Sequence, residues 1–194
     1  MPKKIFIVFG HNNYKSGSSF NAAVRDTFIE EAKKNSHKID LLNIYEDKRL
    51  KFWDGGKPDE QILDYRKRLE QADVMLIMSP CHNYIMNSAT ENFIANIFTP
   101  PWSFSYRKII GNWGYPVPNV LKNKTAIISM TYGGPSFFVS AIIQQIPRRI
   151  KKMVFNGLCG MKVKYLRFYE VLPGMTKQIF EKHMEKVRIL AQQL

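Results

Sequence analysis

Cysteine is scarce in this chain of 194 residues, which contains only Cys81 and Cys159. Neither belongs to a Cys-x-x-Cys pair or to a Cys and His pattern with metal-ligand spacing, so the sequence predicts no zinc or other metal site. A disulfide scaffold is excluded too, because a chain of this length buries enough apolar surface to fold without cross-links. The low cysteine count is typical of a reducing compartment, and we expect a cytoplasmic protein.

Long hydrophobic runs are also absent. The run Ile5–Phe9 is too short for the core of a secretion signal. No apolar run approaches the roughly 18 residues that suggest a membrane-spanning helix. We therefore expect a protein with no membrane span.

Acidic residues are few, and they are unevenly placed. Residues 1–97 hold 14 basic and 13 acidic side chains, residues 98–194 hold 15 basic and 3 acidic ones, and the stretch 92–169 has no acidic residue. The second half should therefore attract anions, although a simple contribution to solubility explains it as well. No helix-turn-helix, zinc-finger or RNP signature is present, so we expect no nucleic-acid partner. An acidic protein partner stays open.

Short buried-strand patterns alternate with helical patterns along the whole chain. The continuous apolar run Ile5–Phe9 is typical of a strand covered on both faces, and helical spacing starts at Phe20 with Ser18 or Ser19 as the N-cap. Further strands are expected at 39–44, 74–78, 126–130 and 158–168, further helices at 58–72, 88–98, 136–153 and 175–194, and an irregular segment at 99–124. This alternation predicts a single α/β domain over residues 1–194, with a five-stranded parallel sheet between helices.

Three loops are the candidate functional regions, because open parallel sheets bind ligands beyond the carboxyl ends of their strands. They are residues 11–21, 79–88 and 131–136. The first loop combines hydroxyls, a glycine and a helix N-terminus, which favours a phosphate monoester or a compact diphosphate. An ordinary capped helix explains it equally well. The loop has neither the G-x-G-x-x-G nor the Walker A pattern, so a dinucleotide-binding Rossmann fold and a P-loop NTPase are disfavoured.

Short motifs in these loops follow one another in a recognisable order. Gly-His and then Ser-Ser-Phe-Asn mark the first loop, Ser-Pro-Cys-His-Asn-Tyr the second, and Thr-Tyr-Gly-Gly the third, with Phe-Ser-Tyr at 104–106 and Leu-Lys-Asn-Lys at 121–124 between them. The ordered set resembles the flavodoxin-like NAD(P)H:quinone oxidoreductases over nearly the whole chain. This resemblance implies a flavodoxin-like, doubly wound sheet with helices on both faces. It also implies a flavin at the three loops, with these cofactor-binding candidates: His11, Ser18, Ser19, Phe20, Asn21, Pro80, Cys81, His82, Asn83, Tyr84, Thr131, Tyr132, Gly133 and Gly134.

The resemblance further implies a flavin-dependent NAD(P)H oxidoreductase. NAD(P)H would reduce bound FMN, and the flavin would then pass two electrons to a small acceptor such as a quinone, in ping-pong order. FAD is the alternative cofactor, but the long C-terminal extension of the larger FAD-binding members has no counterpart here. A homodimer is implied as well, with 99–124 as its candidate surface. Trp102, Phe104 and Tyr106 are candidates for the substrate pocket, and core or dimer packing is their alternative role.

The chain departs from the family pattern at several positions. Asn83 stands where Trp or Tyr is frequent, and Asn87 where Pro or Ser is frequent. The Tyr and His that act beyond the Gly-Gly loop in the best-known members fall near 138–139 and 143–144 here, so no catalytic residue is assigned. The alternative function is therefore a non-catalytic or weakly flavin-binding subunit that docks an acidic partner such as an ion-transport system. His183 is expected to be structural.

Overall fold

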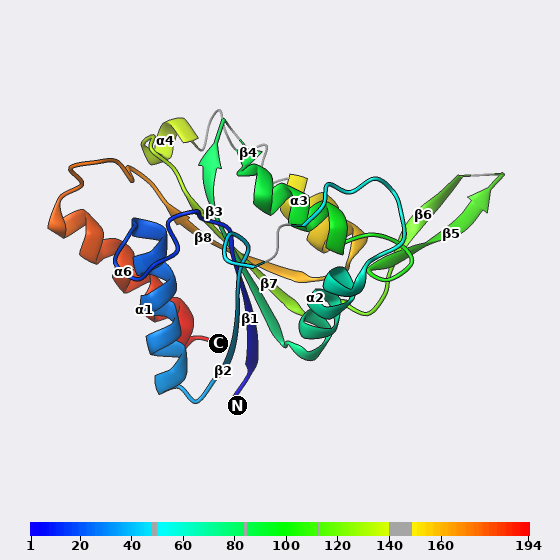
Figure 1. Ribbon diagram of the computed structural model, residues 1–194, viewed down its shortest axis with the longest axis horizontal. Helices are drawn as coiled ribbons and strands as arrows, with labels where there is room; N and C mark the ends of the chain where they lie inside the picture. The colour runs from blue at the N-terminus through cyan, green and yellow to red at the C-terminus, as the bar shows by residue number, and fades with distance from the viewer. Residues whose placement is uncertain (48–49, 84, 112, 140–148) are drawn as a thin grey trace.

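The computed structural model describes residues 1–47, 50–83, 85–111, 113–139 and 149–194. Its core is a parallel sheet with the strand order β2-β1-β3-β7-β8 (Figure 1). The strands are β1 (Lys4–Phe9), β2 (Lys38–Asn43), β3 (Val74–His82), β7 (Thr125–Thr131) and β8 (Lys162–Phe168). The predicted five-stranded α/β sheet is confirmed. From β1 the chain continues to β2 on one side of the sheet and then crosses to β3 on the other side. Open sheets of this kind bind ligands at such a switch point.

Helices cover both faces of the sheet (Figure 1). Alternate strand residues such as Ile5 and Ile7 pack against one pair of helices, while Phe6 and Val8 pack against the helices of the other face. The first pair is α1 (Phe20–Lys34) and α6 (Lys177–Gln192), and the other face carries α2 (Glu60–Gln71), α3 (Ser88–Ile97) and the π-helix η2 (Arg149–Leu158). This double cover explains why the inner strands β1, β3 and β7 are buried along most of their length.

Polar side chains fix where the helices begin. The Ser19 hydroxyl accepts a hydrogen bond from the Ala22 N–H at 3.1 Å, which confirms one of the two predicted caps of α1. The sequence placed Pro58 in the first turn of α2, but the N-cap is Asp59. The predicted helix therefore began two residues too early, because the Asp59 carboxylate accepts from the Ile62 N–H at 3.0 Å and Pro58 lies outside the helix. In the described parts of the chain, every helix is too short or too polar to cross a bilayer.

Two further predictions of local structure were wrong. The segment 99–124 is not irregular, since β5 (Phe104–Ile110) and β6 (Trp113–Pro118) form an antiparallel hairpin. Prolines in this segment suggested breaks, but a two-stranded ribbon tolerates them at its edge. The last strand begins at Lys162 rather than Leu158, because η2 continues to Leu158 and Gly160 then turns the chain at φ +65°. Of the predicted helix 136–153, the short α4 (Ser136–Phe138) and the start of η2 are described, and 140–148 lies outside the described residues.

Substitution of Gly160 by alanine should destabilise the fold through two separable effects. The residue has a left-handed backbone, and a Cβ would lie 2.8 Å from the Pro118 side chain. Gly174 is left-handed as well, at φ +86°, but a Cβ there meets nothing within 4 Å. We expect Gly174→Ala to lose about 1 kcal/mol of unfolding free energy and Gly160→Ala about 2 kcal/mol or more, measured by urea denaturation. Equal losses would show that the contact with Pro118 has no energetic weight.

Candidate functional site

The three predicted loops meet at the carboxyl edge of the sheet. The Gly10 N–H donates to the Met78 carbonyl at 2.8 Å, which extends the pairing of β1 with β3 into the first loop. Pro80 pairs with Thr131 in the register of β3 and β7. The Asn21 amide, from the start of α1, donates to the Thr131 hydroxyl at 3.2 Å. The fold therefore brings all three loops to one place, as the sequence predicted.

Asn87 joins the ends of three elements beneath these loops. Its side-chain amide donates to the Gly10 carbonyl, and its backbone N–H donates to the Ser79 hydroxyl at 3.2 Å. Its carbonyl oxygen accepts from the backbone N–H and the hydroxyl of Thr90 at 2.9 and 2.8 Å, which caps α3. The side chain is buried, and its hydrogen bonds hold β1, β3 and α3 together. This departure from the family pattern has a structural role that sequence reasoning missed.

The second loop leaves the sheet through a short reversal. The strand β4 (Ile85–Met86) pairs antiparallel with Cys81 and His82 at the end of β3. Asn83 begins the turn with φ +46°, a conformation that asparagine tolerates better than the aromatic residues frequent in the family. Cys81 is half-buried, His82 and Asn83 are exposed, and Tyr84 lies outside the described residues.

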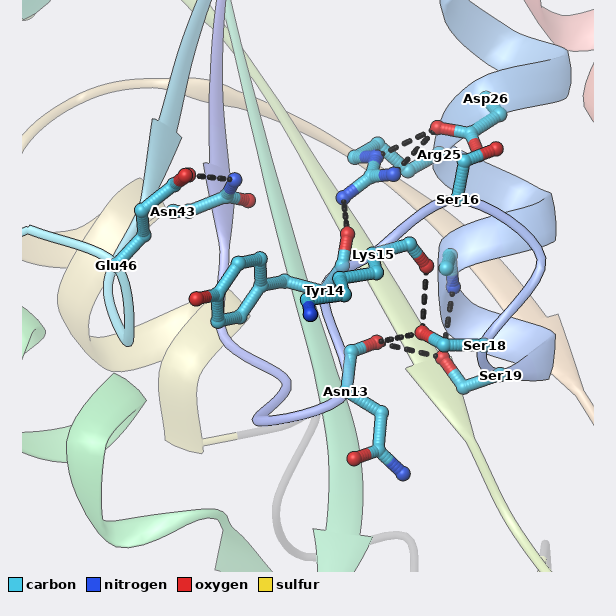
Figure 2. A network of polar contacts seen from close by, with 11 residues as sticks. Asn13, Tyr14, Lys15, Ser16, Ser18, Ser19, Arg25, Asp26, Asn43 and Glu46 are labelled. Carbon is cyan, nitrogen blue, oxygen red and sulfur yellow. Dashed lines mark hydrogen bonds and ion pairs between the residues drawn. The ribbon is translucent and has the colours of Figure 1, made fainter.

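The first loop is closed by hydrogen bonds of its own (Figure 2). The hydroxyls of Ser18 and Ser19 both lie within hydrogen-bond distance of the Asn13 carbonyl, at 3.0 and 2.9 Å. The Ser18 hydroxyl also lies close to the Lys15 carbonyl, to which the Ser18 N–H donates at 3.1 Å. The loop is thus held in shape by its serines. If an anion bound here, the two hydroxyls would only have to rotate to donate to the anion in place of the Asn13 carbonyl.

Arg25 fastens this loop to α1 and β1 from below. Its guanidinium donates to the Tyr14 carbonyl, pairs with Asp26 at 2.6 Å and lies 4.7 Å from the centre of the Phe9 ring. Asp26 in turn accepts from the Ser16 hydroxyl at 2.8 Å (Figure 2). Sequence reasoning missed Arg25. The sequence did contain a sign of this role, because Arg25 is a charged residue next to Val24 on the buried face of the predicted helix.

The start of α1 supplies unused polar groups. The N–H groups of Phe20 and Asn21 stand in the first turn, where a helix provides no acceptor for them. Asn21 is 5% exposed, and its side-chain oxygen has no partner among the described residues. A buried amide oxygen without a partner is unfavourable, so this atom fits a ligand that donates a hydrogen bond.

His11 stands at the end of β1 as a neutral hydrogen-bond donor. Its Nδ1 accepts from the Asn13 N–H at 3.1 Å, so the neutral ring carries its proton on Nε2. Burial lowers the pKa of His11, and the nearby His82 lowers it further. At neutral pH the side chain therefore offers an N–H without a full positive charge.

The Tyr132 side chain points into the core and not toward the loops. Its ring is 3% exposed and stacks on Tyr169 with 5.7 Å between ring centres. Burial raises the pKa of this phenol. The Tyr132 backbone is held on both sides, by its N–H to the Phe168 carbonyl at 2.8 Å and by the Val171 N–H to its own carbonyl at 3.0 Å. The ring of Tyr132 is therefore kept away from a ligand at this edge, and these hydrogen bonds fix the course of its backbone.

Gly133 and Gly134 continue this loop with close support from the segment after β8. A Cβ on Gly133 would lie 3.1 Å from the Leu172 side chain. The Gly134 carbonyl accepts from the Glu170 N–H at 3.2 Å. Glu170 itself has φ +60°, which is unfavourable for a residue with a side chain and needs such contacts to persist.

The three aromatic pocket candidates do not join the loops within one chain. Trp102 donates to the Glu70 carboxylate at 2.5 Å and lies under the Arg66 guanidinium, near the last turns of α2. That end of α2 precedes β3 and lies at the opposite edge of the sheet. Phe104 is 4% exposed and packs in its own chain, whereas Tyr106 is 62% exposed on the projecting hairpin (Figure 1).

Comparisons with known proteins agree with this architecture. A family model described as a flavodoxin-like fold matches residues 3–190. The NAD(P)H:quinone oxidoreductase from Methanothermobacter marburgensis superposes with a TM-score of 0.82 at 14% identity, over 99% of this chain and 98% of that one. An FMN-dependent NADH-azoreductase from Bacillus anthracis, solved with FMN, gives 0.77 at 18% identity, over 100% and 99%. No curated protein matches the sequence. At these identities the structures show a shared fold.

The contact between Gly10 and Thr90 should be sensitive to a single methyl group. A Cβ on Gly10 would lie 2.0 Å from the Thr90 hydroxyl and 3.1 Å from the Met78 carbonyl. We expect Gly10→Ala to lose about 2–3 kcal/mol of unfolding free energy, because overpacking forces the two elements apart. Thr90→Ala removes the clashing hydroxyl, so the double variant should lose less than the sum of the two single variants. Strict additivity in chemical denaturation would contradict this account.

Acid should destabilise the protein through its buried imidazoles. Burial lowers the pKa of His11, His37 and His183 in the folded protein. The unfolded chain therefore binds protons first as the pH falls, so this stability is complete above pH 7 and declines from about pH 6.5 downward. Thermal unfolding at pH 8, 7, 6 and 5 measures the effect. A melting temperature that stays constant or rises between pH 7 and 5 would contradict it.

Proposed function

This chain belongs to the flavodoxin-like fold family, and we propose that it is a flavin-dependent NAD(P)H oxidoreductase with FMN at the three-loop edge. One observation carries the proposal. The start of α1 lies at the same edge of the sheet as the close-packed Gly133–Gly134 backbone, and there, within the described residues, the Asn21 side-chain oxygen has no hydrogen-bond partner. The proposed phosphate site and the backbone that would face the flavin ring would thus lie side by side at the carboxyl edge of the sheet.

The polar groups of the edge fit FMN. The N–H groups of Phe20 and Asn21 and the hydroxyls of Ser18 and Ser19 would hold the phosphate, with His11 as a neutral donor beside them. The only carboxylate bonded to the first loop in the described structure is Asp26, and Arg25 neutralises it. The Asn21 oxygen would accept a hydrogen bond from a ribityl hydroxyl.

The ring end of the cofactor would lie between the second and third loops. Thr131, Gly133 and Gly134 present backbone there, and a glycine backbone allows a ligand to approach closely. The proposed residues on the opposite side are Pro80, Cys81, His82 and Asn83. Bound flavin supplies hydride and electron transfer, and the chain positions it and stabilises negative charge on the reduced ring through N–H groups.

NAD(P)H and a small acceptor would use the exposed side of the flavin in turn, which predicts ping-pong kinetics. Structures with this fold include a quinone oxidoreductase and azoreductases, and we propose an acceptor of that flat, conjugated kind. FMN is favoured over FAD because the described donors all lie around one phosphate-sized loop. We place this chemistry in the cytoplasm, where two cysteines stay reduced.

A second copy of the chain is the proposed cover for the β5–β6 hairpin. The hairpin exposes Tyr106 at 62%, Ile109 at 50%, Ile110 at 75% and Trp113 at 65%. A two-stranded ribbon is only marginally stable alone, and such an apolar cluster marks an interaction surface. In a homodimer Tyr106 is free to line the partner's substrate pocket, whereas Trp102 and Phe104 are packed within their own chain.

The alternative is a subunit that docks an acidic protein. Among the described lysines and arginines between residues 92 and 169, only Arg149 pairs with a carboxylate, that of Glu91 at 2.7 Å. Lys151 and Arg167 both lie over the Tyr165 ring, at 5.3 and 4.7 Å from its centre. These positive charges, which no carboxylate neutralises in the described part of the chain, would bind the acidic surface of a partner protein. Such a docking function requires no flavin.

FMN binding tests the choice between the two functions. We expect the purified protein to retain a two-banded visible flavin spectrum after incubation with FMN and desalting, and NADH or NADPH to bleach it without oxygen. FMN should bind at least tenfold more tightly than riboflavin, which lacks the phosphate. A colourless protein after reconstitution would contradict the enzyme proposal and favour the docking subunit.

Serine variants locate the phosphate. Ser18→Ala should raise the FMN dissociation constant about tenfold and leave that of riboflavin unchanged, since one charge-assisted hydrogen bond is lost. Ser16→Ala is the matched control, because its hydroxyl bonds Asp26 and not the candidate anion site. Fluorescence titration of both flavins measures these constants. Equal effects of the two variants would contradict the proposed phosphate position.

A further inference from the structure

His183 lies under the candidate site although no predicted function involves it. It stands in the second turn of α6 and is 5% exposed. Its Nε2 lies 3.0 Å from the Tyr169 carbonyl oxygen. A carbonyl oxygen only accepts, so Nε2 carries the proton and donates it.

The other ring nitrogen makes no hydrogen bond within the described part of the chain. Nδ1 is buried without a partner among the described residues. The ring is met edge-on by Phe20 at 5.6 Å and by Phe168 at 5.4 Å between ring centres. Burying an imidazole nitrogen without a hydrogen bond costs free energy. The hydrogen bond that Nε2 donates and the aromatic contacts of the ring must therefore offset this cost.

Through its contact with Phe20, His183 is connected to the start of α1, where the phosphate is proposed to bind. Phe20 is the first residue of α1 and directly follows the N-cap Ser19. Its ring is surrounded by Phe168, Phe180 and His183. The imidazole is therefore part of the cage that sets where the first amides of α1 point.

Through its hydrogen bond to Tyr169, His183 is also connected to the third loop, where the flavin ring is proposed to lie. The carbonyl that accepts from His183 belongs to the residue whose ring stacks on Tyr132. Two residues further on, the Val171 N–H donates to the Tyr132 carbonyl, and between them the Glu170 N–H donates to the Gly134 carbonyl. The donated hydrogen bond thus holds the start of the segment that supports the third loop.

We propose that His183 is a positioning residue for the flavin site, because it ties the phosphate-side and ring-side walls to one point on α6. The proposal rests on the proposed FMN function for its effect on binding. The support of the two loops is independent of any ligand. The hydrogen bond from Nε2 is the essential element, and the ring volume alone is insufficient.

Two substitutions separate the hydrogen bond from the volume. His183→Phe keeps an aromatic ring and removes the donor. His183→Gln can place a side-chain N–H where Nε2 stands, and like the wild-type ring it carries a second polar atom that is an acceptor. We expect His183→Phe to raise the FMN dissociation constant about tenfold, and His183→Gln to stay within about threefold of the wild type. Val187→Ala is the control, because it removes buried volume from α6 one turn beyond His183 and leaves the hydrogen bond to Tyr169 in place.

Amide hydrogen exchange of the unliganded protein supplies a second readout. The N–H groups of Tyr132 and Val171 should exchange about tenfold faster in His183→Phe, but at the wild-type rate in His183→Gln and Val187→Ala. The inference is overturned if His183→Phe changes neither exchange nor FMN affinity, or if all three variants change both alike. If the wild type fails to bind FMN, the proposed function fails, and the exchange rates still decide whether His183 positions the loops.

Discussion

The close approach of the first loop to α3 is the constraint on which the rest of the site depends. Gly10 has no side chain, so the Thr90 hydroxyl occupies the space where a Cβ would stand. This contact lets Asn87 reach the Gly10 carbonyl while its own oxygen caps α3. The ends of β1, β3 and α3 are thereby fixed before any ligand contact is made. Preorganisation of this kind reduces the free-energy cost of ordering a binding site.

The polar groups of the site can donate hydrogen bonds to a ligand although few of them carry a net charge. The serine hydroxyls bond to the Asn13 carbonyl, the Arg25 charge is compensated by Asp26, and His11 is kept neutral by burial. What remains for a ligand is a set of N–H and O–H dipoles at a helix start, which suits a phosphate. The larger positive charge of the second half lies on other surfaces, including the edge strand β8 with Lys162 and Lys164.

Sequence reasoning succeeded where the signal was local. The apolar run of β1 and the cap Ser19 depend on a few neighbouring residues, so their spacing predicted them. The roles of Asn87 and His183 arise from contacts with residues far away in the chain, such as Gly10 and Tyr169, which no local pattern encodes. The motif that predicts Tyr132 at the cofactor says nothing of its ring, which packs in the core with Ile128 and Met130 of β7.

The account's central claim is that one ligand, FMN, bridges the start of α1 and the Gly133–Gly134 loop. Amide hydrogen exchange with and without FMN tests it most directly, because the whole backbone is followed at once. We expect FMN to slow exchange in residues 11–21 and 131–134 together, with no change in the last turns of α2 at the opposite edge of the sheet. Protection confined to one of the two loops, or found instead in another part of the chain, would contradict the account.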